Sequence, residues 1–354
     1  MTAYTALALQ VEARAVTERA DLAAAVARVG ARVGGSKAWL GPGLRLVVLP
    51  EYVLTGFPVR ESPAGWRAKA ALDVDGPEYR ALAAVASAEE VFLCVNAYER
   101  DEHFPELYFQ ASVIFSPAGE AVLRYRRLHS LFTPTPYDVW ERYLDLYGLD
   151  GVLPVARTEI GNLAVLASEE ILVPELARAL ALRGAEVFCH PTSEAYSPAL
   201  TPKAVARRAR AVENLAFVVS ANTGGLSGIA IPGDSVNGGS ELIDHEGRAL
   251  AQAGPGESLV AAAELDLAAL RRARRRPGMA NLPSRVKTAL WAQVYAAHDV
   301  ERPGGLDGGA TPDRAFFTAR QRETIDRLHD LDRLHDLDRL HDLDRLHDVD
   351  RPPG

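Results

Sequence analysis

Residues 163–175 read LAVLASEEILVPE and contain the turn that decides the fold. The apolar run that ends in small residues predicts a buried strand. Pro174 predicts the first turn of a helix, which should end at Arg183 before a capping Gly184. Ser168 then lies at a strand-to-helix turn, here called the elbow, where a side chain is presented and backbone N–H groups can face a developing oxyanion. This position suits a nucleophile, and the alternative is a serine that caps the helix.

An acidic residue follows a second predicted strand. Residues 44–58 read LRLVVLPEYVLTGFP, with Glu51 directly after the apolar run and a proline. Pockets in α/β proteins open at the carboxyl ends of strands, so this carboxylate is a candidate site residue. The alternative is a capping or ion-paired Glu at the strand exit.

A basic segment follows a predicted pair of strands. Residues 123–143 read LRYRRLHSLFTPTPYDVWERY, with Tyr125, Arg126, Arg127 and His129 before the acids Asp138 and Glu141. A cation that emerges beside an acid-bearing turn can hold a substrate oxygen. The alternative is a solvated basic edge.

Most of the chain alternates short apolar runs with Ala- and Arg-rich stretches of helical period, which is typical of a layered α/β domain. Strands are predicted at residues 5–10, 44–49, 91–96, 111–116, 163–167, 186–190, 217–221, 240–244 and 259–264. Helices are predicted at residues 19–33, 78–88, 174–183 and 202–215. Turn signals at 117–119 and 245–247 predict hairpins among helix-connected strands, so the sheets should be mixed.

Composition excludes several classes of protein. The chain has 354 residues, enough for one large domain or two smaller ones, and 48% of them are hydrophobic. Wholesale disorder is excluded, and no apolar run reaches the roughly 20 residues of a membrane span. The formal net charge of −8 supplies no basic field for nucleic acid. Two cysteines cannot make a disulfide scaffold and MTAYTALALQ does not resemble a secretory signal, so a cytoplasmic location is expected.

The sequence changes character near residue 300, where the compact domain, residues 1–300, is expected to end. Residues 301–325 begin with a Gly- and Pro-rich stretch that predicts a surface linker and a short helix. Residues 326–354 contain four DRLHDL-type hexads, whose period drifts around a helix and gives no straight apolar stripe. A solvated, expanded low-complexity tail is therefore expected. The alternative is capture of a metal ion by His329, His335, His341 and His347.

The three segments together resemble the nitrilase, or carbon–nitrogen hydrolase, superfamily. LPEYVLTG is similar to the family's glutamate motif, Tyr125-Arg126-Arg127 to its Tyr-Arg-Lys motif, and SEEILVPE to its Cys-x-Asp/Glu and Pro-Glu motif. Residues 209–225, ARAVENLAFVVSANTGG, resemble its Arg-Ala-x-Glu-Asn helix and the strand that follows. Residues 238–247, GGSELIDHEG, resemble its Gly-x-Ser hairpin. The five motifs span roughly residues 5–290.

The resemblance implies a four-layer α-β-β-α sandwich and a Glu-Lys-Cys triad that attacks amides or nitriles, with no cofactor and no metal expected. Glu51 falls at the position of the catalytic glutamate. Two positions depart from the family. No lysine occurs between Lys69 and Lys203, so Arg127 stands at the lysine position, and Ser168 rather than a cysteine stands at the elbow.

Two hypotheses follow for the function. In the first, the chain hydrolyses non-peptide C–N bonds in small amides, with Glu51 as base, Arg127 as oxyanion clamp and Ser168 as nucleophile or water-positioning group. In the second, it is an inactive pseudoenzyme in which Arg127 binds a small anionic or amide ligand. Arg127 is also expected to pair with Glu51 and suppress its basicity. The residues expected to contact the ligand are Tyr125, Glu141, Glu170, His190 and Asn222.

The expected partners are a small-molecule ligand and a second copy of the chain. The resemblance implies a homodimer or higher homo-oligomer that packs through helices near the elbow. The predicted helix at residues 174–183 reads PELARALALR and has the apolar stripe that such packing requires. No nucleic-acid or membrane partner is expected.

Overall fold

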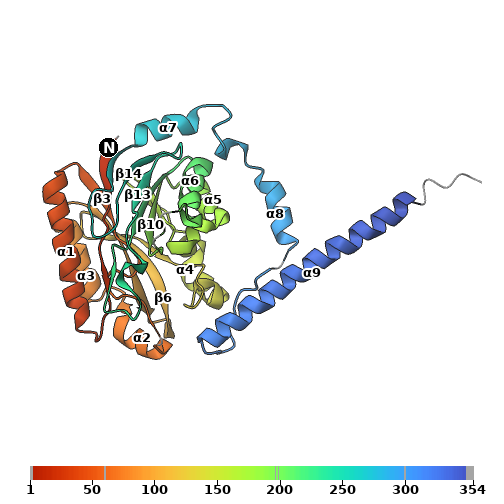
Figure 1. The fold of residues 1–354 in the computed structure, drawn as a ribbon, viewed down its shortest axis with the longest axis horizontal. Coiled ribbons are helices and arrows are strands. Elements are labelled where there is room, and N and C mark those ends of the chain that lie inside the picture. Colours follow the sequence, from red (N-terminus) through yellow and green to blue (C-terminus); the bar gives the residue numbers. More distant parts are fainter. Residues whose placement is uncertain (1–2, 60, 196, 198, 299, 348–354) are drawn as a thin grey trace, which may run out of the picture.

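Two β-sheets form the centre of the molecule in a computed structural model (Figure 1). The structure describes residues 3–59, 61–195, 197, 199–298 and 300–347, with the backbone alone for residues 331–347. In the described residues, one sheet has 7 strands in the order β15-β1-β3-β5-β6-β7, with β4 paired to β5. The other has 6 strands in the order β14-β13-β11-β10-β9-β8, and β12 pairs separately with β2.

The strands agree closely with the apolar runs of the sequence. The first sheet contains β1 Ala3–Ala8, β3 Leu44–Val48, β4 Leu72–Asp73, β5 Phe92–Asp101, β6 Phe104–Phe115, β7 Ala121–Arg126 and β15 Ala262–Asp266. The second contains β8 Ala156–Thr158, β9 Gly161–Val165, β10 Val187–Thr192, β11 Phe217–Asn222, β13 Glu241–Ile243 and β14 Ala249–Gln252. The short pair is β2 Ala13–Arg14 with β12 Leu226–Ser227.

Both sheets are mixed, as predicted. The strands β1, β3 and β5 run parallel to one another, and so do β9, β10 and β11. The hairpins β6–β7 and β13–β14 are antiparallel and turn at Gly119 and Gly247, whose positive φ angles suit glycine. Parallel neighbours bring their carboxyl ends to the same edge of a sheet, so residues that follow them gather in space.

Helices cover the outer face of each sheet and complete the predicted α-β-β-α sandwich (Figure 1). The helices are α1 Asp21–Leu40, α2 Pro63–Ala70, α3 Pro77–Ala88, α4 Trp140–Val152, α5 Pro174–Leu182, α6 Pro202–Asn214, α7 Leu267–Arg275, α8 Thr288–Ala296 and α9 Arg314–His347. Short 3-10 helices are η1 Pro136–Val139, η2 Ser168–Leu172, η3 Gly233–Ser235 and η4 Pro283–Arg285. The helices α1 and α3 pack on the first sheet, and α5 and α6 on the second.

The alternation of side chains along β3 shows how the layers form. Leu46 and Val48 face the second sheet, within the core that also contains Phe188 of β10. Val47 points the other way, against the apolar stripe of α1 that includes Val26. A strand alternates the two faces of its sheet, whereas a helix returns to one face every three to four residues. The two periods together explain why these runs form layers.

The C-terminal region departs from the sequence-based expectation. The segment expected as a surface linker packs on the domain: Leu306 is buried against Val139 and Tyr143, and its backbone N–H donates to Asp138 O at 2.8 Å. The backbone of the hexads through residue 347 continues α9, since a helix needs only local hydrogen bonds, and the solvated tail stays a prediction. The side chains of His335, His341 and His347, named for metal capture, lie outside the described residues. None of the described helices has the length and apolar character needed to cross a membrane.

Candidate active site

The candidate site forms where strands of both sheets end. Glu51 follows β3 of the first sheet, and Ser168 follows β9 of the second. Thr192 ends β10 and ties the two sheets together, because its carbonyl accepts a 3.3 Å hydrogen bond from the Glu51 N–H. The predicted gathering of strand ends therefore brings Glu51 and Ser168 into one region.

Ser168 occupies a strained position at the elbow. Its φ angle is 54°, in the left-handed region that costs a non-glycine residue about 1–3 kcal/mol. Tyr52, which follows Glu51, also has a positive φ of 62°. The surrounding structure must hold both turns, and such strained positions are concentrated at functional sites.

His190 holds the elbow through the backbone. Its Nε2 atom lies 2.9 Å from the Ser168 carbonyl oxygen, and its Nδ1 atom lies 2.8 Å from Ser220 Oγ. A carbonyl only accepts, so Nε2 carries the proton and Nδ1 accepts from the Ser220 hydroxyl. Burial lowers the His190 pKa well below its ordinary value, and the charge of Arg207 lowers it further. The imidazole is therefore neutral and positions Ser168.

Glu170 is the second support of the elbow. Its Oε1 atom accepts hydrogen bonds from the Tyr125 hydroxyl at 2.6 Å and from the backbone N–H groups of Leu128 and His129 at 2.8 and 3.0 Å. Its Oε2 atom accepts from the Ala167 N–H at 3.0 Å. This buried carboxylate thus joins the elbow to the segment that carries Arg127. Burial, followed by the charge of Glu170, raises the Tyr125 pKa, so the phenol stays protonated and donates.

Arg127 is held by four groups of the protein. Its Nη1 atom donates to Glu51 Oε1 at 2.9 Å and to Gln110 Oε1 at 2.5 Å, while Gln110 Nε2 donates to the same Glu51 oxygen at 2.6 Å. Arg127 Nε donates to the His129 carbonyl, and Nη2 pairs with Glu169. Burial alone would lower the Arg127 pKa, but the charges of Glu51 and Glu169 outweigh it and raise the pKa. The predicted pairing of Arg127 with Glu51 is present in the structure.

A lysine that the sequence analysis did not select lies beside Ser168. Lys203 Nζ is 3.1 Å from Ser168 Oγ and 3.2 Å from Thr192 Oγ1. The side chain starts from the first turn of α6, which begins at Pro202 and is capped by the Thr201 hydroxyl. Burial lowers the Lys203 pKa, the charges of Glu51 and Glu169 oppose this, and the net shift is downward. Lys203 is thus a further charged residue of the site, in addition to Arg127 and Glu51, and it contacts Ser168 from α6.

A family model for carbon–nitrogen hydrolases matches residues 15–275, which include Glu51, Arg127, Ser168 and Lys203. The chain belongs to the carbon–nitrogen hydrolase family. It is 28% identical over 232 residues to a formamidase of Bacillus cereus (strain Q1), a match that covers 65% of each chain. It is 30% identical over 217 residues to a formamidase of Bacillus thuringiensis (strain Al Hakam), covering 60% of each. The matches thus span less than two thirds of these curated relatives.

Solved structures from the nitrilase superfamily share the fold. Nit3 of Saccharomyces cerevisiae superimposes with a TM-score of 0.62 at 20% identity, covering 77% of this chain and 94% of Nit3. A carbon–nitrogen hydrolase from Helicobacter pylori G27 gives 0.62 at 18% identity, covering 83% and 98%. An amidase from Nesterenkonia sp. gives 0.59 at 18% identity, covering 83% and 96%. At these identities the likeness establishes the α-β-β-α fold of the carbon–nitrogen hydrolases for this chain.

Some residues named from the sequence lie outside the cluster of Glu51, Arg127 and Ser168. Glu141 is exposed in the first turn of α4, and no hydrogen bond or ion pair in the described part of the chain joins it to the cluster. The acid that pairs with Arg127 in addition to Glu51 is Glu169, which adjoins the elbow. Asn222 uses its side chain to hold the backbone of Glu194 and Gly238. Glu141 therefore lies away from the cluster, and its contact with a ligand stays a prediction.

The two cysteines are neighbouring free thiols inside the sandwich. Cys94 of β5 and Cys189 of β10 are free, buried and part of the core between the sheets. A hydrogen bond to Cys189, followed by burial, raises the Cys94 pKa well above its ordinary value. A protonated thiol is a weak nucleophile, so Cys94 packs as a small apolar residue and does not replace the missing cysteine of the elbow.

Two cavities adjoin the cluster. One of about 350 Å³ is lined by His129, Glu169 and residues of α9 that include Phe317. The other, of about 490 Å³, is lined by Glu194, Asn222 and the start of α6. Glu169, whose side chain is 41% exposed, connects the first cavity to buried Arg127. Of the two cavities, this is the one whose lining includes partners of Arg127.

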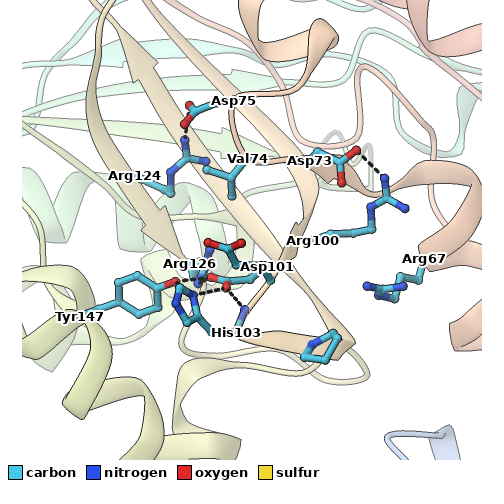
Figure 2. Close-up of a pocket in the computed structure, with 12 residues that line it drawn as sticks. Arg67, Asp73, Val74, Asp75, Arg100, Asp101, His103, Arg124, Arg126 and Tyr147 are labelled. Carbon is cyan, nitrogen blue, oxygen red and sulfur yellow. Dashed lines mark hydrogen bonds and ion pairs between the residues drawn. The ribbon is translucent and has the colours of Figure 1, made fainter.

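A separate cavity of about 580 Å³ is lined by residues of β5 and β7 (Figure 2). Three of its four arginines are paired with acids, namely Arg100 with Asp73, Arg124 with Asp75 and Arg126 with Asp101. The described residues that line it include no serine, threonine, cysteine or lysine. No group of three or more metal-ligating side chains occurs in the described part of the chain. Ser168 and the other residues of the cluster lie outside the lining of this cavity.

Proposed function

We propose that this chain hydrolyses the carbon–nitrogen bond of small non-peptide amides, with Ser168 as the nucleophile. The observation that carries the proposal is the Ser168 hydroxyl itself, presented at a strained elbow with φ of 54° and 3.1 Å from a buried amine. A serine that only capped a helix would need neither the strain nor a buried cation beside its Oγ atom. Membership of the carbon–nitrogen hydrolase family supports the same chemistry.

The proposed substrate class is that of short primary amides, with formamide as the first candidate. The curated relatives named above carry the name formamidase, which supports this choice. Ser168 is 5% exposed and Glu51 is 1% exposed, so the substrate must be small enough to reach a closed site. Hydrolysis would release ammonia and the carboxylic acid.

The pseudoenzyme alternative depends on Arg127, and the contacts of this residue weaken it. Arg127 already donates to Glu51, Gln110 and the His129 carbonyl and pairs with Glu169. A ligand anion would therefore compete with two carboxylates for the guanidinium. The same contacts weaken the idea that Arg127 acts as a freely available oxyanion clamp.

The test is ammonia release from formamide, acetamide and propionamide by the purified full chain. We expect turnover that is lost in Ser168→Ala and retained in Ser87→Ala, a matched change at an exposed serine on α3. Thermal shifts with each amide, recorded in parallel, separate binding from catalysis. Melting shifts without product for every amide would favour the pseudoenzyme. Turnover that survives Ser168→Ala but is lost in Glu51→Gln would instead indicate that Glu51 activates water directly.

We also propose that two copies pack through α5 and the neighbouring apolar surface. Leu182 at the end of α5 and Leu172 before it are 58% and 42% exposed. Trp291 on α8 is 50% exposed, and Tyr295 of the same helix donates to Glu175 of α5. The helices α5 and α8 therefore present one apolar surface for a second copy to cover.

A further inference from the structure

Lys203 supplies an amine to a serine that otherwise has no base suited to it. The Lys203 Nζ atom lies 3.1 Å from Ser168 Oγ, within the range of direct proton transfer. Thr192 Oγ1, 3.2 Å from the same nitrogen, fixes the approach from the end of β10. Two hydroxyls on different elements thus hold the amine at the nucleophile.

Glu51 is less well matched to a serine hydroxyl than an amine is. Its Oε1 atom already accepts hydrogen bonds from both Arg127 and Gln110, at 2.9 and 2.6 Å. A carboxylate also binds protons far more weakly than an amine, whereas serine is a much weaker acid than the cysteine of the family's triad. Replacement of the thiol by a hydroxyl therefore requires a stronger base than Glu51.

His190 is excluded by its hydrogen bonds. Its Nε2–H donates to the Ser168 carbonyl and its Nδ1 accepts from Ser220, so both ring nitrogens are occupied and neither faces Ser168 Oγ. Arg127 is always protonated and cannot accept a proton. Among the described residues that contact the Ser168 side chain, Lys203 is the group that can take its proton.

We propose that Lys203, in its neutral form, is the general base that deprotonates Ser168, and that Ser168 and Lys203 act as a catalytic dyad on this fold. This inference rests on the proposed function, because it presumes that Ser168 is the nucleophile. Burial lowers the Lys203 pKa and outweighs the opposing charges of Glu51, Glu169 and Glu194. The charge of Arg127 and the position of Lys203 in the first turn of α6 act in the same direction as burial, so the neutral fraction near neutral pH is increased.

The dyad accounts for each proton in the reaction. Ser168 Oγ attacks the amide carbon while its proton moves to Lys203 Nζ and the carbonyl electron pair moves to oxygen. The C–N bond then breaks as the leaving nitrogen takes the proton from Lys203, which releases ammonia and leaves an acyl ester on Ser168. Water next attacks the ester carbon and gives its proton to Lys203. The ester C–O bond breaks, Ser168 Oγ recovers that proton, and the acid is released.

The competing role for Lys203 is that of a permanently charged group that stabilises the oxyanion without exchanging protons. The two roles differ in what arginine can do at position 203. Arginine keeps the positive charge but is not deprotonated in proteins. Lys203→Arg therefore removes a base while it preserves a charge, and Lys203→Met removes both with a similar length of side chain.

The experiment measures the rate at which a small fluorophosphonate labels the full chain, followed by intact mass and peptide mapping. Labelling reports the nucleophilicity of Ser168 even where amide turnover is slow. We expect modification at Ser168 whose rate rises with pH, with an apparent pKa below that of an ordinary lysine. Both Lys203→Arg and Lys203→Met should lower the rate about 10²–10⁴-fold and remove this rise.

Lys287→Arg and Lys287→Met serve as matched controls, since Lys287 is exposed before α8, and both should label at the wild-type rate. Melting temperatures identify any variant that fails to fold. If Lys203→Arg or Lys203→Met does not fold, Lys203→Gln replaces it in the labelling experiment. If Lys203→Arg keeps the wild-type rate and pH profile, the lysine is a charge and the dyad is wrong, while the proposed function stands. If wild-type Ser168 is neither labelled nor required for ammonia release, the nucleophile assignment fails, and the dyad fails with it.

Discussion

The Nη1 atom of Arg127 donates a 2.9 Å hydrogen bond to Oε1 of Glu51, and both side chains are almost completely buried. An isolated charge at either position would be costly, because little water reaches it. The pair therefore gives each buried side chain a partner of opposite charge, and it helps to hold Arg127 in place. The effects of substitutions at Glu51 and Arg127 on the free energy of unfolding should therefore be coupled.

We expect Arg127→Met to lower the free energy of unfolding by about 3–5 kcal/mol, because it leaves the buried Glu51 carboxylate without its partner. Glu51→Gln in the same chain removes that orphaned charge. The double variant should then be more stable than the sum of the two single changes implies, by about 1–3 kcal/mol. Urea unfolding of the wild type and three variants measures this coupling, and simple additivity would contradict the inferred pairing.

Much of the site could be predicted from sequence because its residues directly follow strands. Glu51 after β3 and Ser168 after β9 are placed by strand ends, which apolar runs identify. Lys203 could not be found this way, because its contact depends on how α6 crosses the ends of β9 and β10. The available signals were the scarcity of lysine and the Thr201–Pro202 helix start, which places residue 203 in a first turn.

The position of Glu141 relative to Arg127 could not be predicted from the sequence, for a different physical reason. The sequence places it after a basic segment, and the distance along the chain is short. In the structure, η1 and α4 follow the Arg127 strand pair and leave Glu141 exposed, and the Asp138 carboxylate fixes the start of η1 by accepting hydrogen bonds from the Thr135 N–H and hydroxyl. Glu169 pairs with Arg127 because the elbow is close in space, although it is far along the chain.

We expect wild-type stability to fall as the pH is lowered below about 6.5, in part because of His190. Burial holds the His190 pKa well below its ordinary value, so in this window the unfolded chain binds a proton that the native state does not. Unfolding is then favoured by up to about 1.4 kcal/mol per pH unit from this one group. His190→Gln should reduce the slope of unfolding free energy against pH between about 6.5 and 5.

The control for this measurement is His298→Gln, which alters an exposed histidine near the end of α8. It should leave the slope at its wild-type value. If His190→Gln and wild type show the same slope, then His190 is protonated in the native state, and its role as a neutral donor to the Ser168 carbonyl is wrong.

Glu170 should matter more for stability than any single group that donates to it. Glu170→Gln keeps the shape but loses the charge and turns an NH2 group toward the backbone N–H of Leu128, His129 or Ala167. We expect a loss of about 3 kcal/mol or more, because hydrogen bonds to charged groups contribute about 1.5–3 kcal/mol each. Tyr125→Phe removes one of these donors and should cost about 1–3 kcal/mol.

Chemical denaturation of both variants measures these losses, and fluorophosphonate labelling shows whether the elbow stays in place. Glu170→Gln should slow labelling of Ser168 more than Tyr125→Phe does, because Glu170 alone contacts the Ala167 N–H beside the elbow. Equal effects of the two changes would mean that the Tyr125 hydroxyl, rather than the whole set of donors, supports the elbow.

The proposed dimer makes a prediction that depends on a single exposed leucine. Leu182 ends α5 with 58% of its surface exposed, next to the apolar face that α8 completes through the Tyr295–Glu175 hydrogen bond. We expect wild type to sediment as a dimer or larger assembly at micromolar concentration. Leu182→Glu places a charge inside the covered surface, where it would lose its hydration, and should shift the protein to monomer.

Leu250→Glu, at an exposed leucine of β14, provides the matched control and should leave the assembly intact. A wild-type monomer at tens of micromolar, or a Leu182→Glu variant that sediments like the wild type, would show that this face is not the interface.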